Sequence, residues 1–523
     1  MATAISLDKP HTQAEPSKAY NFMGTLPNET LARIFILGKK AERYDDYNNG
    51  HGHQRRSCTL GAPFQVRTAQ VCKRWRAIVI GMPELWSHIE IRSQKILDHL
   101  LVYLQRAGPN TLLEIEVDLR NHITPPTIDA WDAGDLTGYH EPDVGHQVKL
   151  VKEALGCLVF NGGEPSRWVE LAFWAKSYEP VVAVVEFLAG FALSNLRRLL
   201  LVNSKEYVTK FWLDAASARV GRLFRRPPPL LHSAKLINLP STLMFNNNNL
   251  KTASISNLTY LSLKFGEMGA RPRLEGLRSL FSHNRQVETL ILNLSEIGGG
   301  VVIPEPGLAD ARVSLPCLQR FSFQIPKSRT WAVHLFQMID APRLESLSLF
   351  CGDLHDSMDE IAFYLTYGVS EIIGGAQTQI GGSASYSPIY PALQHLALIS
   401  YAGGRKALHA LLSSLSKLSD LDWALMYNIP KLLERVFSSP GVCPNLERLR
   451  VKGASEDELV RTVDAIIQSG SPLKTVQVQA RNWRAYGSKL SERFFIPGQG
   501  PRVEAIGPYI PGALEGEESD FDV

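Results

Sequence analysis

The sequence predicts an α/β protein in which a small helical domain precedes a long domain of repeated strands and helices. Three observations lead to this prediction. The chain has 523 residues, too many for one simple core. Amphipathic helical segments occupy part of the first 92 residues. Beyond residue 110, short apolar runs recur at nearly regular intervals, which is typical of repeat proteins.

The first helical segment is LPNETLARIFILG, and residues 1–23 before it are polar and expected to be disordered. Pro27 suits the first helical turn because its missing N–H would be unpaired there, and Glu29 favours the same end through the helix dipole. An apolar stripe follows at i, i+3 and i+4: Leu31, Ile34 and Phe35. Gly38 is expected to end this helix.

Residues 39–63 are polar, rich in Asn and Gly, and without periodicity, so they predict a loop. A metal site at His51, His53 and Cys58 is the alternative, but a closed zinc site needs four ligands with paired spacing. A second helix is expected from Phe64 until Gly81 stops it. Its buried side is expected to contain Val66, Ala69, Val71, Cys72, Trp75, Ile78 and Val79. Its basic residues, Lys73, Arg74 and Arg76, are expected to point elsewhere and to stay solvated.

Apolar runs that mostly share the frame L-x-x-L-x-L predict the strands of the long domain. They begin at Thr111, Arg167, Leu196, Leu258, Val287, Leu318, Leu344, Leu393, Leu418, Leu446 and Leu473. From Leu258 onward the steps are 29, 31, 26, 49, 25, 28 and 27 residues, mostly within or near the range of a leucine-rich repeat. The step of 49 contains residues 372–388, which predict an inserted loop. A compact α/β domain whose strands merely begin with leucine is the alternative.

Helical stretches lie between these strands, as in LEGLRSLFSHN and ALHALLSSLSKL. The most apolar run, Val181–Leu193, is too short to span a membrane and predicts a buried helix. The predicted organisation is a disordered segment at 1–23, a helical domain at 24–92, a repeat domain at 110–490 and an acidic flexible tail at 491–523.

Composition and motifs argue against several functions. The net charge of +3 gives no bulk electrostatic case for nucleic acid or a membrane, although Lys73, Arg74, Arg76, Arg225 and Arg226 leave nucleic-acid binding as a minor alternative. The six cysteines form no CxxC pair, which is typical of reduced thiols in the cytoplasm or nucleus. The common phosphate-binding, zinc-protease and hydrolase motifs are missing from the sequence, so we expect neither an enzyme nor a cofactor.

Two segments, LPNETLARIF and VCKRWRAIVIGMPELWSHI, together resemble an F-box. Both halves of the family motif occur in order. The matching residues are Leu26, Pro27, Glu29, Leu31, Ile34, Phe35, Val71, Cys72, Trp75, Arg76, Pro83, Leu85 and Trp86. The insertion at 39–63 departs from the family pattern, yet loop closure becomes only slowly more costly with length. The whole chain then resembles fungal F-box proteins, with an α/β fold in which a small helical F-box is followed by an irregular leucine-rich-repeat-like solenoid.

The resemblance implies a substrate-recognition subunit of an SCF-type cullin–RING ubiquitin ligase. The F-box would bind the Skp adaptor and, through it, the cullin and RING subunits. The implied adaptor-binding residues are those of the motif, namely Leu26, Pro27, Glu29, Leu31, Ile34, Phe35, Val71, Cys72, Trp75, Leu85 and Trp86. The repeat domain would hold a protein substrate. A non-enzymatic interaction scaffold that acts outside a ubiquitin ligase is the alternative function.

Overall fold

The structure is a computed structural model, and two compact units make up the chain. It describes residues 25–48, 63–92, 94–120, 144–204, 223–239, 254–265, 272, 274–294, 312–325, 329–351, 358–368, 388–424, 431–453, 456–479 and 501–506. The N-terminal unit comprises Met1–Trp86 with Arg106–Gly108, and the C-terminal unit comprises Ser87–Gln105 with Pro109–Val523.

The N-terminal unit is a small helical assembly. Its helices are α2 (Asn28–Asn48), α3 (Phe64–Val71), α4 (Lys73–Ile80) and the single turn α5 (Pro83–Trp86). Its core contains Leu31, Phe35, Val79, Leu85 and Trp86. The indole N–H of Trp86 donates a hydrogen bond to the carbonyl of Val79 at 2.8 Å, so the largest core side chain is both buried and satisfied.

Helix α2 does not end at Gly38, as the sequence predicts, but continues to Asn48. The glycine serves the packing of α3 instead, because a Cβ at Gly38 would lie 2.6 Å from Cζ of Phe64. A side chain at this position would force the ring of Phe64 to shift. The prediction of a loop is therefore wrong for residues 39–48, while His51, His53 and Cys58 lie outside the described residues.

The second predicted helix is interrupted at Cys72, which has an extended backbone (φ −157°, ψ 169°). Its sulfur accepts a hydrogen bond from the backbone N–H of Trp75 at 3.4 Å and so caps α4. The break shifts the helical periodicity, so residues before and after it do not share one face. Val71 is 61% exposed and Cys72 is also exposed, and the prediction that both lie on the buried side is wrong.

A parallel sheet of 14 strands dominates the C-terminal unit, with order β1-β2-β3-β4-β5-β6-β7-β9-β11-β12-β13-β14-β15-β16. The strands are β1 (His88–Ile91), β2 (Leu113–Asp118), β3 (Trp168–Ala175), β4 (Arg198–Asn203), β5 (Ser233–Ile237), β6 (Tyr260–Lys264), β7 (Thr289–Asn293), β9 (Arg320–Ile325), β11 (Ser346–Cys351), β12 (His395–Ile399), β13 (Asp420–Ala424), β14 (Arg448–Lys452), β15 (Thr475–Gln479) and β16 (Arg502–Ile506). A separate two-stranded sheet joins β8 (Val313–Ser314) and β10 (Ile339–Asp340).

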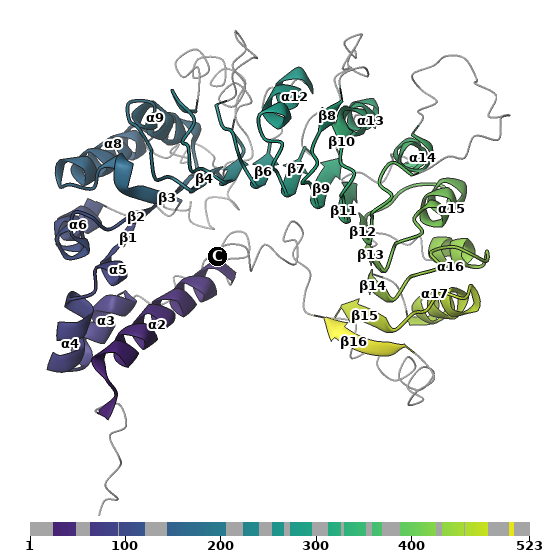
Figure 1. The fold of residues 1–523 in the computed structure, drawn as a ribbon, viewed down its shortest axis with the longest axis horizontal. Coiled ribbons are helices and arrows are strands. Elements are labelled where there is room, and N and C mark those ends of the chain that lie inside the picture. Colours follow the sequence, from purple (N-terminus) through teal and green to yellow (C-terminus); the bar gives the residue numbers. More distant parts are fainter. Residues whose placement is uncertain are drawn as a thin grey trace, which may run out of the picture. The chain divides into compact units, whose positions relative to one another are not determined.

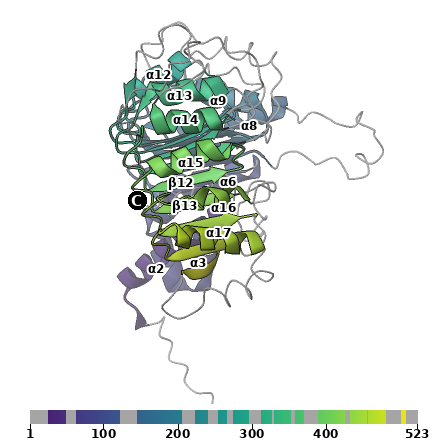
Figure 2. The same cartoon turned by 90° about the vertical axis from the view of Figure 1, so that its right-hand side faces the viewer.

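Helices connect the strands, as a parallel sheet requires. They are α6 (Gln94–Ala107), α8 (Val144–Phe160), α9 (Tyr178–Leu188), α12 (Leu274–Ser282), α13 (Arg329–Met338), α14 (Asp359–Tyr367), α15 (Arg405–Ser414), α16 (Lys431–Phe437) and α17 (Glu456–Gln468). In Figure 1 the strands of this unit line the inner side of a curve and the helices line its outer side. Figure 2 shows α12 to α17 following one another along that outer side.

Every predicted apolar run contains one of these strands, and neighbouring repeats are aligned in register. Leu261 on β6 aligns with Leu290 on β7, and Leu290 aligns with Phe321 on β9. All three side chains are buried. Each such burial is worth about 1.5–3 kcal/mol, but it requires the adjacent repeat to cover the side chain. The predicted helices at Val181–Leu193, LEGLRSLFSHN and ALHALLSSLSKL correspond to α9, α12 and α15.

Five of the described strands, β1, β5, β8, β10 and β16, are absent from the prediction. In β5 the central leucine of the frame is replaced by Ala234, which still aligns with Leu261 and is buried. Strand β16 pairs with β15 although it lies within 491–523, where the sequence predicts only a flexible tail. Its sequence RVEAI contains no leucine, so the leucine frame gives no signal there.

Candidate functional site

The predicted adaptor-binding residues divide into a buried set and a surface set. Leu31, Phe35, Leu85 and Trp86 are buried in the core of the N-terminal unit. Pro27, Glu29, Ile34, Val71 and Cys72 are exposed, and Leu26 and Trp75 are half-buried. The structure therefore brings the motif residues together in one unit, where some of them form the core and the others remain accessible.

Trp75 connects the two sets. Its ring lies 4.9 Å from the ring of the buried Phe35, centroid to centroid, at an angle of 59°. A tilted aromatic pair of this kind contributes about 0.5–1.5 kcal/mol beyond the area that it buries. Because Trp75 is only half-buried, part of the indole remains available at the surface.

Large apolar side chains are exposed on all three longer helices of this unit. They are Ile34, Leu37, Val71 and Ile80, with exposed fractions of 40%, 58%, 61% and 41%. Ile34 and Leu37 are one turn apart and lie on the same side of α2. These four side chains are the large apolar groups that remain exposed in the described part of the N-terminal unit. The sequence analysis missed Leu37 and Ile80, although the spacing of Leu37 from Ile34 is a usable signal.

The basic residues of α4 do not simply stay solvated. The Arg74 guanidinium donates to the side-chain oxygen of Asn28 at 3.0 Å and to the carbonyl of Leu26. Arg76 donates through Nε to the carbonyl of Ala69 at 3.0 Å. Lys73 and Arg76 are exposed, as the sequence predicts, whereas Arg74 is half-buried. The start of α2 is thus fixed to α4 by Arg74, and this corrects the expectation for that residue.

The helical extension of α2 also has structural contacts. Lys39 donates from Nζ to the carbonyls of Leu85 at 3.0 Å and Glu84 at 3.2 Å. These are carbonyls of the single turn α5, where such groups otherwise depend on water. Glu42 accepts a hydrogen bond from the backbone N–H of Phe64 at 3.1 Å and pairs with Arg67. The first part of the predicted insertion therefore supports the unit.

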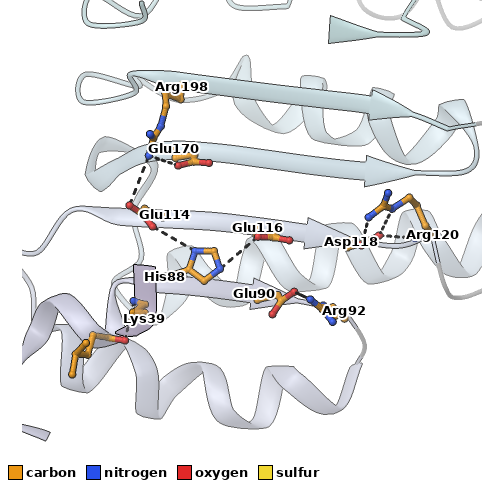
Figure 3. Close-up of polar contacts among 11 residues, drawn as sticks. Lys39, His88, Glu90, Arg92, Glu114, Glu116, Asp118, Arg120, Glu170 and Arg198 are labelled. Atoms are coloured by element: carbon orange, nitrogen blue, oxygen red, sulfur yellow. Dashed lines mark hydrogen bonds and ion pairs between the residues drawn. The ribbon is translucent and has the colours of Figure 1, made fainter. Parts of the chain in front are cut away.

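The side chains that alternate with the buried leucines form the strand face of the C-terminal unit. A polar cluster lies on this face over β1 to β4 (Figure 3). His88 lies 3.5 Å from carboxylate oxygens of both Glu114 and Glu116. Glu170 pairs with Arg198 at 2.6 Å. The Arg198 guanidinium compensates part of the negative charge of the cluster, which suits a supporting role better than acid–base catalysis.

Glu90 belongs to the same cluster and pairs with Arg92. Burial, reinforced by the negative charge of Glu116, raises the pKa of the Glu90 carboxyl above its usual value in spite of this pairing. A carboxyl with a raised pKa at the end of an open sheet is a candidate for proton exchange. His88 and Glu116 act on this carboxyl through their charges, and these two side chains also lie 3.5 Å from each other.

A second part of the strand face, over β9 to β14, forms a hollow of about 590 Å³. The sequence analysis did not identify this site. Aligning the repeats on their leucine frame would have placed Asp422 beside Arg450 and Asp420 beside Arg448, because the register follows that frame. The signal was therefore present, but it required comparison of neighbouring repeats.

Within the described ranges, no group of three or more His, Cys, Asp or Glu side chains is positioned to hold a metal ion. The five cysteines that the structure describes are free thiols. Burial raises the pKa of Cys351 and Cys443 to about 12, so neither is a reactive nucleophile. No helix in the described part of the chain combines the length and the apolar character needed to cross a bilayer.

Comparisons with known proteins assign no family. No family model matches the sequence, and no curated protein matches it. Among solved structures, the chain is similar to the crystal structure of a TLR13–ssRNA13 complex, with 14% sequence identity and a TM-score of 0.29. The match covers 62% of this chain and only 42% of that one. At this TM-score the likeness supports no conclusion about binding or activity.

Proposed function

We propose that the chain is the substrate-recognition subunit of an SCF-type cullin–RING ubiquitin ligase. The N-terminal unit acts as an F-box and binds a Skp-type adaptor, which links it to the cullin and RING subunits. The strand–helix repeats act as a leucine-rich-repeat-like solenoid and hold a protein substrate. The chain itself performs no bond chemistry and uses no cofactor, and it works in the cytoplasm or nucleus.

One observation carries the proposal. The two segments that resemble an F-box fold into one helical unit, and Leu31, Phe35, Leu85 and Trp86 belong to its core. The same unit leaves Ile34, Leu37, Val71 and Ile80 exposed. A unit this small gains stability by burying apolar groups, so an exposed apolar set has a cost that a bound partner would remove. An F-box has this division between core and docking residues.

The mechanism is proximity. Holding a substrate close to the ubiquitin donor replaces a bimolecular encounter with an effectively unimolecular one, which increases the rate without any catalytic group on the receptor. The strand face, opposite the helices, offers polar and apolar side chains from many strands to a substrate, as solenoid proteins commonly do.

The proposal is tested by the affinity of the full chain for a purified Skp-type adaptor, measured by calorimetry. Exposed positions are replaced so that the core is preserved: Ile34→Glu and Val71→Glu. Truncating a central apolar anchor commonly costs about 2 kcal/mol or more, so each variant should lose roughly thirtyfold or more in affinity.

A matched control uses the same substitution at another exposed apolar residue. Phe160 ends α8 in the C-terminal unit and is 90% exposed, so Phe160→Glu should bind the adaptor like the parent. Equal binding by the parent and both N-terminal variants would contradict the proposal. If the adaptor binds but the cullin never co-purifies from cells, the chain is an interaction scaffold outside a ligase.

A further inference from the structure

Four successive connections at one edge of the C-terminal unit lead from helices into β2, β3, β4 and β5. Because the sheet is parallel, all of its strands start at the same edge, and these connections therefore lie side by side. Their described residues are 109–112, 161–167, 189–197 and 223–232. We call these four segments the β2–β5 edge.

Hydrogen bonds join the neighbouring segments of the β2–β5 edge. The Arg167 guanidinium donates to the carbonyl of Thr111 at 2.9 Å and 3.1 Å. Asn195 donates from Nδ2 to the carbonyl of Ser166 at 2.7 Å. A backbone hydrogen bond of 3.0 Å joins the connection before β5 to the connection before β4. The four segments therefore form one continuous edge.

Each of these connections, or the helix end that leads into it, exposes a large apolar side chain. The four side chains are Leu112, Phe160, Phe191 and Leu230, with exposed fractions of 36%, 90%, 41% and 46%. Phe160 is the last residue of α8, and Leu158 in the same helix is fully buried. Two residues correspond to more than half a helical turn, so Phe160 points away from the core that holds Leu158.

The two phenylalanine rings are attached to ordered structure. Gly162, with a φ of 83°, has the left-handed backbone that ends α8 directly after Phe160. The ring of Phe191 lies 4.7 Å from the ring of Phe187, which in turn stacks on the buried Trp168 at 6.1 Å. Both rings therefore project from fixed positions into water, where their apolar surface is unfavourable.

The β2–β5 edge is also cationic. Glu164 is the single carboxylate within the four segments, and its negative charge acts on Arg167 of the same connection. Three further arginines, Arg197, Arg225 and Arg226, are exposed on the next two connections. The exposed apolar side chains are therefore accompanied by positive charge.

The same edge of the sheet differs at β11, β13, β14 and β15. The connections into these strands carry charges of both signs, namely Arg343, Glu345, Lys417, Glu447 and Lys474. They expose no large apolar side chain within residues 341–345, 415–419, 442–447 and 469–474. Lys474 and Glu447 pair with each other at 2.7 Å. These segments have the ordinary character of a solvated surface, in contrast to the β2–β5 edge.

We propose that the β2–β5 edge binds the surface of an anionic phospholipid membrane. Phe160, Phe191 and Leu230 enter the boundary between headgroups and acyl chains. Arg197, Arg225 and Arg226 bind the lipid phosphates. The overall net charge of +3 gives no reason to expect this interaction, which depends on the local arrangement of charge. The proposal goes beyond the ligase function and does not depend on it.

Two features favour a lipid surface over a nucleic acid. Two of the four exposed apolar side chains, Leu112 and Leu230, are aliphatic and cannot stack on bases as aromatic rings do. The apolar groups also come from four neighbouring connections at one edge of the sheet, so a flat surface can meet them together. Arginine suits the same boundary, because its apolar stem can lie along the acyl chains while the guanidinium stays at the phosphates.

The test is cosedimentation of the full chain with phosphatidylcholine vesicles that either contain or lack phosphatidylserine. The chain should bind the vesicles with phosphatidylserine at least tenfold more tightly, because each arginine at an anionic surface adds about a factor of five in affinity. Added salt should weaken this binding, because it screens the attraction between the arginines and the lipid.

Substitutions at exposed positions leave the core intact. Phe160→Glu should weaken binding to the phosphatidylserine vesicles at least tenfold, and Phe160→Trp should bind like the parent. Arg226→Gln should weaken it about fivefold. The matched controls are Ile467→Glu in α17 and Lys417→Gln before β13, both exposed and outside the β2–β5 edge, and both should bind like the parent.

Equal binding of the two kinds of vesicle, or undiminished binding by Phe160→Glu, would overturn the proposal. Binding of a single-stranded RNA that requires Arg226 but is unaffected by Phe160→Glu would also overturn it, because the arginines would then serve a nucleic acid. Phe160→Glu should still bind the Skp-type adaptor, and Ile34→Glu should still bind the vesicles. These two variants separate a failure at this edge from a failure of the ligase proposal.

Discussion

Replacing Gly38 by alanine should destabilise the N-terminal unit, against the ordinary trend for helices. Gly38 lies inside α2, where Gly→Ala normally gains about 1 kcal/mol. The new Cβ, however, would lie 2.6 Å from Cζ and 2.7 Å from Cε2 of Phe64. Overpacking of this kind costs about 1–3 kcal/mol, so we expect a net loss of up to about 2 kcal/mol.

A double-mutant cycle with Phe64→Ala identifies the cause. Without the ring, the alanine at position 38 gains space, and Gly38→Ala should then stabilise the unit by about 1 kcal/mol. A matched control is Gly156→Ala in α8, where an added Cβ meets no atom within 4 Å and should stabilise its helix in either background. Hydrogen exchange of the α2 and α8 amides in the full chain measures each local free energy.

Two results would refute this reasoning. If Gly38→Ala destabilises α2 equally with and without the Phe64 ring, the glycine is needed for its own backbone conformation, as a helix end would require. If it stabilises α2 in both backgrounds, the close approach of Phe64 does not exist. Either result would contradict the role assigned to Gly38 in packing against Phe64.

Three further predictions test separate contacts. Arg74→Ala should cost about 1–2 kcal/mol in the local stability of α2, measured by hydrogen exchange, whereas Lys73→Ala should change it by less than about 0.5 kcal/mol. Asn284→Ala removes hydrogen bonds to the backbones of residues 255, 258 and 280 in a fully buried site and should cost about 2–4 kcal/mol in denaturant unfolding. Glu90→Gln should raise the melting temperature at pH 8, because the raised pKa of Glu90 in the folded state means that its charged carboxylate opposes folding. This gain in melting temperature should shrink as the pH falls through the folded-state pKa. It should vanish below about 4.3, the pKa of a glutamate in the unfolded chain. Unchanged stability of Arg74→Ala or Asn284→Ala, or a Glu90→Gln effect independent of pH, would contradict the corresponding contact.

The strands of the C-terminal unit were predictable because the frame L-x-x-L-x-L places its leucines directly in the shared core. Leu421 and Leu449, for example, are aligned neighbours on β13 and β14, and both are fully buried. Where a smaller residue replaces the central leucine, as Ala234 does on β5, the leucine pattern no longer predicts the strand, although the strand forms. The neighbouring repeats supply the pairing, and a single run contains no sign of this.

Helix ends in the N-terminal unit were not predictable from local signals. Gly38 has the residue type of a helix end, but its role depends on Phe64, which lies far along the chain. Cys72 caps α4 through its thiol and is not among the residues that usually do so. Arg74 carries the sequence signal of a solvated charge, and only the fold shows that the Leu26 carbonyl lies within its reach.

The measurement that most directly tests the central claim is hydrogen exchange of the full chain with and without a saturating Skp-type adaptor. The account predicts slower exchange in peptides from α2, α3 and α4, where Ile34, Leu37, Val71 and Ile80 are exposed. It predicts no change in the strands that line the hollow, β9 to β14. Unchanged exchange throughout α2 to α4, or protection confined to the sheet, would contradict it.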